Sequence, residues 1–134
     1  MEIWIAIPDY ENYYEVSNKG RIRSIERTVK SQLPGGTIRR IKRSSKMLKP
    51  KINKRGRRQG YLQVYLAKNG QRKMVYVHRM VLLAFQGPSS LICNHINGVT
   101  TDNRIENLEY CTYKENRVHA VQILGVQSGK KKKI

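Results

Sequence analysis

Basic residues are concentrated in one stretch of this chain, and this distribution limits what the stretch can fold into. Of the 27 lysines and arginines among 134 residues, 16 lie between Lys19 and Arg58, where Glu26 is the single acidic residue. A segment with so many like charges buries little apolar surface and requires an anionic partner. The formal net charge of +18 makes nucleic acid the first candidate. An RNA-binding structural protein or a membrane-surface protein would share this balance, so charge alone leaves these classes open.

Residues 26–60 are therefore predicted to form a basic arm or linker. Apolar periodicity is weak there, and Pro34-Gly35-Gly36 and Pro50 interrupt regular structure. We expect the arm to become ordered only on its partner. The residues expected to contact phosphates are Arg21, Arg23, Arg39, Arg40, Lys42, Arg43, Arg55, Arg57 and Arg58. For Arg21 and Arg23, two solvated side chains would explain the pattern equally well.

The remaining chain predicts an α+β protein. Residues 1–25 alternate around a Ser-Asn-Lys-Gly turn at 17–20, which indicates a small β-rich module. Residues 61–66 and 73–77 flank Asn69-Gly70, a strong hairpin signal. A helix from His78 to Phe85 should follow and end at Gly87-Pro88, with His78 packed as part of the scaffold.

Residues 90–125 predict a unit in the order strand, loop, strand, helix. The strands are expected at 91–95 and 108–111. Thr112 and Glu115 have the spacing of a capping box and predict a helix that runs toward Gly125. Together with residues 61–90 this unit forms a region at 61–125, and residues 126–134 are expected to be a basic, solvated tail.

Polar residues recur at informative positions in this last unit. His95 ends the first strand, Asn107 follows after eleven intervening residues, and Asn116 follows after eight more. The first strand and the helix of such a unit face each other, so Asn94, His95 and Asn116 can converge on one pocket. Asn107 could fix the imidazole ring. Phosphodiester hydrolysis needs a base that works near neutral pH and a cation on the phosphate, and these side chains suit both needs.

The stretch NHINGVTTDNRIENLEYCTYKEN, residues 94–116, resembles the core of HNH homing-type endonucleases of phages and mobile introns. VYVHRMVLLAF, residues 75–85, resembles the segment that leads into that core. EIWIAIPDYENYYEVSNKGRIRSI, residues 2–25, is similar to a short N-terminal module often found ahead of it. The resemblance covers most of the chain outside the basic arm and tail, and implies a ββα-metal (HNH) nuclease core.

The resemblance also implies roles for individual residues. His95 falls on the general base that deprotonates water, and Asn107 on the asparagine that orients this histidine or braces the loop. Asn94 and Asn116 fall on the metal-ligand positions, where relatives often have aspartate and histidine. One Mg²⁺ or Mn²⁺ per active site is expected, held here by neutral amide oxygens, so its binding should be weak without DNA. Asp102 is the alternative carboxylate, and His119 could be a second ligand or an exposed helix residue.

The expected function is metal-dependent hydrolysis of double-stranded DNA by a phage or homing-type endonuclease that nicks or cuts the duplex. A noncatalytic DNA-binding protein on the same scaffold is the alternative. We expect a monomer or weak dimer in the cytoplasm or nucleoid of the host, neither secreted nor bound to membranes, because no apolar run reaches the length of a membrane helix. Cys93 and Cys111 are predicted to be buried free thiols.

Overall fold

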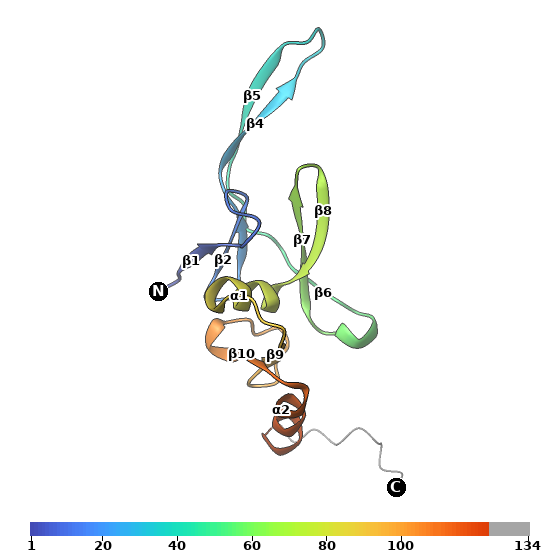
Figure 1. Ribbon diagram of the computed structural model, residues 1–134. Helices are drawn as coiled ribbons and strands as arrows, with labels where there is room; N and C mark the ends of the chain where they lie inside the picture. The colour runs from blue at the N-terminus through green and yellow to red at the C-terminus, as the bar shows by residue number, and fades with distance from the viewer. Residues whose placement is uncertain (124–134) are drawn as a thin grey trace.

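The computed structural model describes residues 1–123 (Figure 1). The predicted basic tail and the last part of the predicted final helix lie outside the described residues. The N-terminal module is a three-stranded antiparallel sheet of β1 (Trp4–Ala6), β2 (Tyr14–Ser17) and β3 (Ile22–Ser24). The turn predicted at 17–20 joins β2 to β3, and Gly20 in this turn has a φ of 84°, a left-handed conformation that favours glycine.

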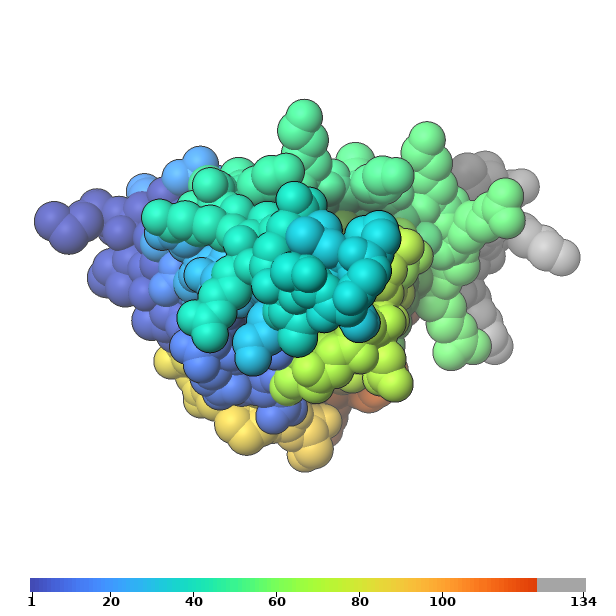
Figure 2. Space-filling view, turned by 90° about the horizontal axis from the view of Figure 1, so that it is seen from above, coloured from blue at the N-terminus to red at the C-terminus, as the bar shows by residue number. Residues whose placement is uncertain are grey.

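The prediction that residues 26–60 form an arm or linker is wrong for much of this segment, because residues 27–43 form a β-hairpin. Strand β4 (Arg27–Gln32) pairs with β5 (Ile38–Arg43), and Pro34-Gly35-Gly36 makes the turn between them. The hairpin projects away from the other sheets (Figure 1), and in the view from above it lies in front of them (Figure 2). Its ends meet at the body, where the Ser24 amide donates to the Lys46 carbonyl over 2.8 Å.

The hairpin predicted around Asn69-Gly70 is confirmed. Strand β7 (Leu62–Lys68) pairs with β8 (Gln71–Tyr76) across Asn69 and Gly70, which both have positive φ values as a tight two-residue turn requires. The short strand β6 (Lys51–Ile52) adds to β7, and the 3₁₀ turn η1 (Gly56–Arg58) connects β6 to β7. The end of the predicted arm is therefore also regular structure.

The predicted helix and the strand, loop, strand, helix unit are confirmed. Helix α1 (Val77–Gln86) ends at Gly87. Strands β9 (Ile92–His95) and β10 (Leu108–Cys111) pair antiparallel, and the 3₁₀ turn η2 (Ile105–Asn107) ends the intervening loop. Helix α2 (Tyr113–Val118) begins with the predicted capping box, and a π-helical turn, η3 (His119–Ile123), follows it.

One hydrophobic core joins these units. Its buried members come from the N-terminal sheet, the β7–β8 hairpin, α1 and β10, and they include Val16, Leu66, Leu82 and Leu108. Helix α1 lies between the N-terminal sheet and the β9–β10 pair (Figure 1). The regions separated in the sequence therefore fold as one packed body.

Polar contacts also hold the N-terminal module against the β9–β10 loop. The Ile105 amide donates to the Asn18 carbonyl over 2.9 Å. A Cβ atom on Gly20 would lie 2.7 Å from the Asn103 carbonyl oxygen, closer than real contacts allow. The turn that joins β2 to β3 thus fits closely against the loop before η2, and only glycine leaves room for that approach.

No helix among residues 1–123 has the length and apolar character needed to cross a membrane. Cys93 and Cys111 are free thiols, with Cys111 buried and Cys93 partly buried. Burial raises the pKa of Cys93 to about 11. The prediction of a buried free thiol is confirmed for Cys111 and in part for Cys93, whose raised pKa keeps it in its unreactive protonated form.

Candidate functional site

His95 ends β9 with its ring buried against the core side of the β9–β10 pair. Its Nε2 lies 2.8 Å from Oδ1 of Asn103, which is also buried. Because an amide oxygen only accepts hydrogen bonds, Nε2 carries the proton and Nδ1 keeps its lone pair. Burial lowers the pKa of His95, so that the ring is neutral near pH 7. A neutral ring held in this tautomer can accept a proton at Nδ1.

An aromatic cluster holds the other faces of this ring. The ring centroids of Tyr61 and His95 lie 5.6 Å apart, and those of His78 and His95 lie 5.0 Å apart. His78 is buried on α1, as predicted, and burial lowers its pKa to about 3. In the described part of the chain, Nδ1 of His78 is fully buried without a hydrogen-bond partner, and Nδ1 of His95 is not among the atoms in that position. Of the two imidazoles, His95 is therefore the one suited to proton transfer.

Asn107 does not contact the imidazole but fixes the loop between β9 and β10. Its Oδ1 accepts from the Asn97 amide, and its Nδ2 donates to the Asn97 side chain and to the Asp102 carbonyl, each over 2.9 Å. Of the two roles that the resemblance implies, these contacts correspond to bracing the loop. Asn103, inside that loop, is the residue that orients His95.

Asn94 precedes His95 and points to the opposite face of β9. Its side chain is buried, and its Nδ2 donates to Oε1 of Glu109 over 2.9 Å. Glu109 lies directly across the ladder on β10. The amide nitrogen is thus occupied, and Oδ1 of Asn94 is available as a ligand.

Asn116 lies on α2 and lines an open hollow of about 380 Å³. Ile92 on β9 and Tyr61, which stacks on His95, line the same hollow. Arg57, Arg58 and Arg79 complete a positively charged wall. A phosphate group fits this wall through charge-assisted hydrogen bonds.

The donor set fits a hard divalent cation. Asn94 and Asn116 carry the amide oxygens expected as ligands, and Glu109 adds a carboxylate beside Asn94, although Asn94 itself does not line the hollow of Asn116. Within residues 1–123, three or more histidine, cysteine or acidic side chains nowhere cluster closely enough to hold a metal. The site would therefore depend on amide oxygens, the one nearby carboxylate and the phosphate of the substrate.

Two other candidate ligands have different partners. Asp102 forms an ion pair with Arg104 at 2.8 Å, and the Arg104 hydrogen bonds lower the pKa of Asp102 to about 2. His119 lies with its Nε2 2.6 Å from the Ile96 carbonyl, so it ties the end of α2 to the loop instead of being an exposed helix residue. Neither contact brings these side chains toward Asn94.

The residues predicted to bind phosphates divide into three groups. Arg21 and Arg23 form ion pairs with Glu2 and Glu15, and the Arg23 guanidinium lies 4.0 Å from the centre of the Trp4 ring. The residues on the projecting hairpin are exposed: Arg39, Arg40, Lys42 and Arg43. Arg55, Arg57 and Arg58 lie at η1, and the last two line the hollow with Asn116.

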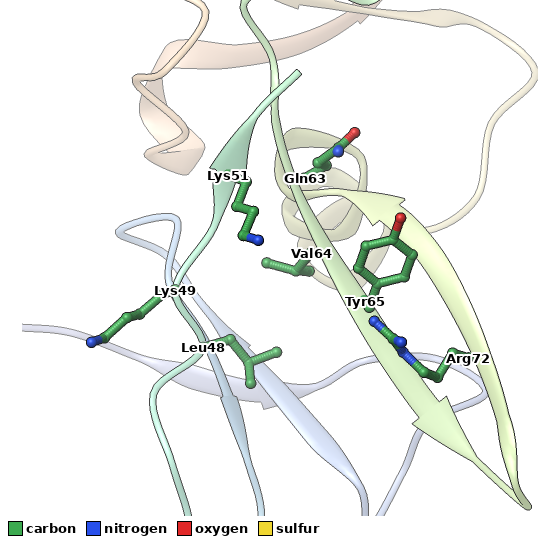
Figure 3. Close-up of a pocket in the computed structure, with 7 residues that line it drawn as sticks. All are labelled: Leu48, Lys49, Lys51, Gln63, Val64, Tyr65 and Arg72. Atoms are coloured by element: carbon green, nitrogen blue, oxygen red, sulfur yellow. The ribbon is translucent and has the colours of Figure 1, made fainter. Parts of the chain in front are cut away.

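A second cavity, of about 250 Å³, lies between the segment at β6 and the β7–β8 hairpin (Figure 3). Arg72 lies 4.5 Å from the centre of the exposed Tyr65 ring, and Lys49 and Lys51 also line the cavity. This cavity has no histidine or acidic residue in its lining and extends the basic surface.

Four residues of the site were not identified from the sequence: Asn103, Glu109, Tyr61 and Arg79. Spacing could have suggested Glu109, since a pairing of the predicted strands puts it opposite Asn94. The other three are brought to the site by tertiary contacts from a loop, from the residue before β7 and from α1.

Comparison with known proteins identifies two parts in the chain. Residues 75–118 match the HNH endonuclease family, and residues 2–66 match the NUMOD4 motif. An uncharacterized HNH endonuclease of Acanthamoeba polyphaga mimivirus is 37% identical over 83 residues, which are 60% of this chain and 24% of that protein. The DNA endonuclease I-HmuI of Bacillus phage SP01 is 33% identical over 117 residues, 84% of this chain and 54% of that protein. The chain thus spans about a quarter to about half of the length of these relatives.

The fold is also similar to a solved structure. The structure titled "DNA binding and cleavage by the HNH homing endonuclease I-HmuI" matches 95% of this chain and 62% of that one, with a TM-score of 0.69 and 31% sequence identity. The α+β architecture expected from the sequence is confirmed by this match. Residues 75–118 are therefore an HNH endonuclease domain, and a NUMOD4 motif precedes it.

Proposed function

We propose that this chain is a DNA endonuclease that hydrolyses one phosphodiester bond of duplex DNA at the hollow between η1 and α2. The observation that carries this proposal is the orientation of His95, whose Nε2 is committed to Asn103 while its Nδ1 keeps a lone pair. Tyr61 belongs to both the histidine cluster and the hollow, so the base and the phosphate subsite are adjacent.

The residues of the site have distinct roles in this reaction. His95 accepts a proton from the attacking water at Nδ1, and Asn103 keeps the ring in the required tautomer. Arg57, Arg58 and Arg79 hold the scissile phosphate and stabilise the charge that grows on its oxygens. Asn107 fixes the loop that carries Asn103. The products are a 5′-phosphate and a 3′-hydroxyl.

HNH endonucleases generally use a divalent metal ion. Here Asn94 and Asn116 would hold one Mg²⁺ or Mn²⁺, which when bound supplies positive charge to the phosphate and to the leaving oxygen. The choice of Mg²⁺ rests on the hard oxygen donors of the site.

The projecting β4–β5 hairpin is the proposed DNA-binding element. A two-stranded ribbon has the width of the major groove, and basic residues occupy both of its faces. We propose that the hairpin and the η1 arginines of one chain bind the same duplex. We also propose that the chain acts as a monomer or weak dimer. A monomer with one site nicks one strand.

A DNA-binding protein without nuclease activity is the second candidate, because both expected ligand positions hold neutral asparagine. This candidate predicts tight binding to duplex DNA without any strand break when Mg²⁺ or Mn²⁺ is added.

The deciding experiment is conversion of supercoiled plasmid to open circles by wild-type protein and by His95→Ala, with Mg²⁺, Mn²⁺ or a chelator. We expect metal-dependent nicking that falls at least a hundredfold in the variant, since general-base catalysis contributes roughly 10²–10⁴-fold. DNA affinity should be unchanged.

Asn103→Ala is the companion variant. Loss of a group that orients a histidine typically costs about 10–100-fold, so nicking should be slow but measurable. Equal nicking by wild type and His95→Ala would reject His95 as the base, and binding without nicking under all metal conditions would favour the second candidate.

A further inference from the structure

The cation site has an unusual lack of negative charge. Its two expected ligands, Asn94 and Asn116, are both neutral amides. A hard divalent cation normally has at least one carboxylate or phosphate among its ligands. A carboxylate within reach of Asn94 would remove this deficit, and β10 provides one.

Glu109 is the residue directly opposite Asn94 in the β9–β10 ladder. Side chains of directly opposed residues lie on the same face of an antiparallel pair. The Oε1 atom of Glu109 accepts the hydrogen bond from Asn94 Nδ2 at 2.9 Å. In the described chain, Oε2 of Glu109 accepts no side-chain hydrogen bond and forms no ion pair, so one oxygen is available.

The partners of the other carboxylates show how unusual this arrangement is. Four acidic side chains among residues 1–123 are partly buried: Glu2, Glu15, Asp102 and Glu109. The first three form ion pairs with Arg21, Arg23 and Arg104. Glu109 instead contacts a neutral amide, although the chain carries 27 lysines and arginines. Among the partly buried carboxylates of residues 1–123, Glu109 is thus the one without an ion pair.

The same face of β9 leads to Asn116. Ile92 lies two residues before Asn94 and therefore on the same side of the strand. Ile92 and Asn116 line the same hollow. Asn94 and Glu109 therefore lie on the face of the β9–β10 pair whose Ile92 borders the Asn116 hollow.

We propose that Glu109 is the anionic ligand of the cation site, with Asn94 and Asn116 as its neutral ligands. This inference rests on the proposed nuclease function. Glu109 on β10 supplies the negative charge that a carboxylate at position 94 would otherwise supply. Its hydrogen bond to Asn94 Nδ2 turns Asn94 Oδ1 toward the cation. The protein then binds its cation before DNA arrives, which two amides alone would not achieve.

The test is the affinity of the full-length protein for Mn²⁺ alone, measured by electron paramagnetic resonance of free Mn²⁺ and by calorimetry, without DNA. Glu109→Gln keeps the size and an acceptor oxygen but removes the charge, and should weaken Mn²⁺ binding by about tenfold or more. Glu106→Gln is the matched control, because Glu106 is exposed and pairs with Arg104 on the loop. Its Mn²⁺ affinity should equal that of the wild type.

A rescue variant separates loss of charge from loss of folding. Asn94→Asp combined with Glu109→Gln moves the carboxylate to the opposite strand and should restore Mn²⁺ affinity to within a few-fold of the wild type. Thermal melting of each variant confirms that the compared proteins are folded.

Unchanged Mn²⁺ affinity in Glu109→Gln, or wild-type protein that binds Mn²⁺ only after DNA is added, would overturn the role of Glu109. The nuclease assignment would survive both results if wild-type protein still nicks plasmid and His95→Ala does not. Absence of nicking by the wild type with intact, Glu109-dependent Mn²⁺ binding would instead reject the nuclease function and leave the cation site standing.

Discussion

The rings of His78 and His95 have centroids 5.0 Å apart, yet their surroundings suit them to different chemistry. His95 has a hydrogen bond to Asn103 and adjoins the hollow of Asn116 through Tyr61, whereas His78 is enclosed by the core with its Nδ1 unsatisfied. Burial lowers the pKa of both rings, and for His78 the value is about 3. His78 therefore contributes to stability and packing, and its titration affects folding.

His78 predicts acid sensitivity of the fold. As the pH falls below 6.5, the unfolded chain protonates His78, whereas the folded chain does not until the pH approaches 3. Stability contributed by the neutral ring is present above pH 6.5 and is lost between these values, by about 1.4 kcal/mol per pH unit at most. Urea unfolding of wild type and His78→Phe from pH 8 to pH 4 should show a shallower pH dependence in the variant. At pH 8 the difference between the two reports packing alone, and parallel curves down to pH 4 would contradict the buried neutral state.

Residue positions were predictable where spacing along the chain determines them. The spacing of His95 and Asn116 predicted that they would lie near one region, and Tyr61, which stacks on His95, lines the hollow of Asn116; the chemical roles of both residues stay predictions. The partner of the imidazole was not predictable, because Asn103 reaches it from a loop whose path depends on Asn18 and Gly20. Such a contact has no periodic signal in the sequence.

At the scale of elements, the β4–β5 hairpin is notable for like charges that face each other. Arg27 lies opposite Arg43 and Lys30 opposite Arg40, and one ion pair, between Lys42 and Glu26 at 2.9 Å, offsets the repulsion. Like charges in direct cross-strand pairs destabilise a hairpin, and a two-stranded ribbon is marginal on its own. A polyanion placed along the ribbon would remove this repulsion.

The hairpin predicts the salt dependence of DNA binding. Substituting Arg39, Arg40, Lys42 and Arg43 with glutamine should weaken binding to all duplex sequences and reduce the slope of log affinity against log salt by about 0.9 for each phosphate that the variant leaves unneutralised. Fluorescence anisotropy with labelled duplex between low and moderate salt measures both. Lys19→Gln, which removes one exposed charge from the N-terminal turn, should change the slope less than the average hairpin residue does. An unchanged slope in the fourfold variant would mean that these side chains are merely solvated.

Elements with apolar periodicity or defined turn residues were predicted well. Asn69-Gly70 indicated the β7–β8 hairpin, and Thr112 with Glu115 indicated the start of α2. The β4–β5 hairpin was missed because its strands lack an apolar face that alternates with a polar one, so the pattern on which strand prediction depends is absent. Composition predicted disorder there, whereas backbone pairing across a Pro-Gly-Gly turn produces order.

At the scale of the whole molecule, the NUMOD4 and HNH parts share their core. Ile7, Val16 and Ile22 from the first part pack in one cluster with Leu82 of α1 and Leu108 of β10. The sequence suggested separable modules because a basic segment divides residues 1–25 from residues 61–125. The shared core lies outside that segment, so the linear order of charge does not reveal it.

This shared core predicts cooperative unfolding. Leu82→Ala removes a fully buried side chain from α1 and should lower the free energy of unfolding by about 2–5 kcal/mol. Trp4, the single tryptophan, lies on β1 and reports the N-terminal sheet. Its fluorescence transition in urea should shift together with the far-ultraviolet circular dichroism transition. A Trp4 transition that stays in place while the dichroism shifts would show that the two parts unfold independently.

The stem of the hairpin has a consequence for how such proteins diversify. The backbone amides of Ser24 and Lys46 each donate a hydrogen bond to the other residue, over 2.8 Å and 2.9 Å, so the chain leaves the body and returns to it at nearly one point. A segment anchored in this way can be lengthened, shortened or replaced while the packing beneath it is kept. Under the proposed function, recombination at the two ends of the ribbon would give a descendant a different DNA-binding element and leave the residues around His95 intact, so that target preference and hydrolysis could evolve separately.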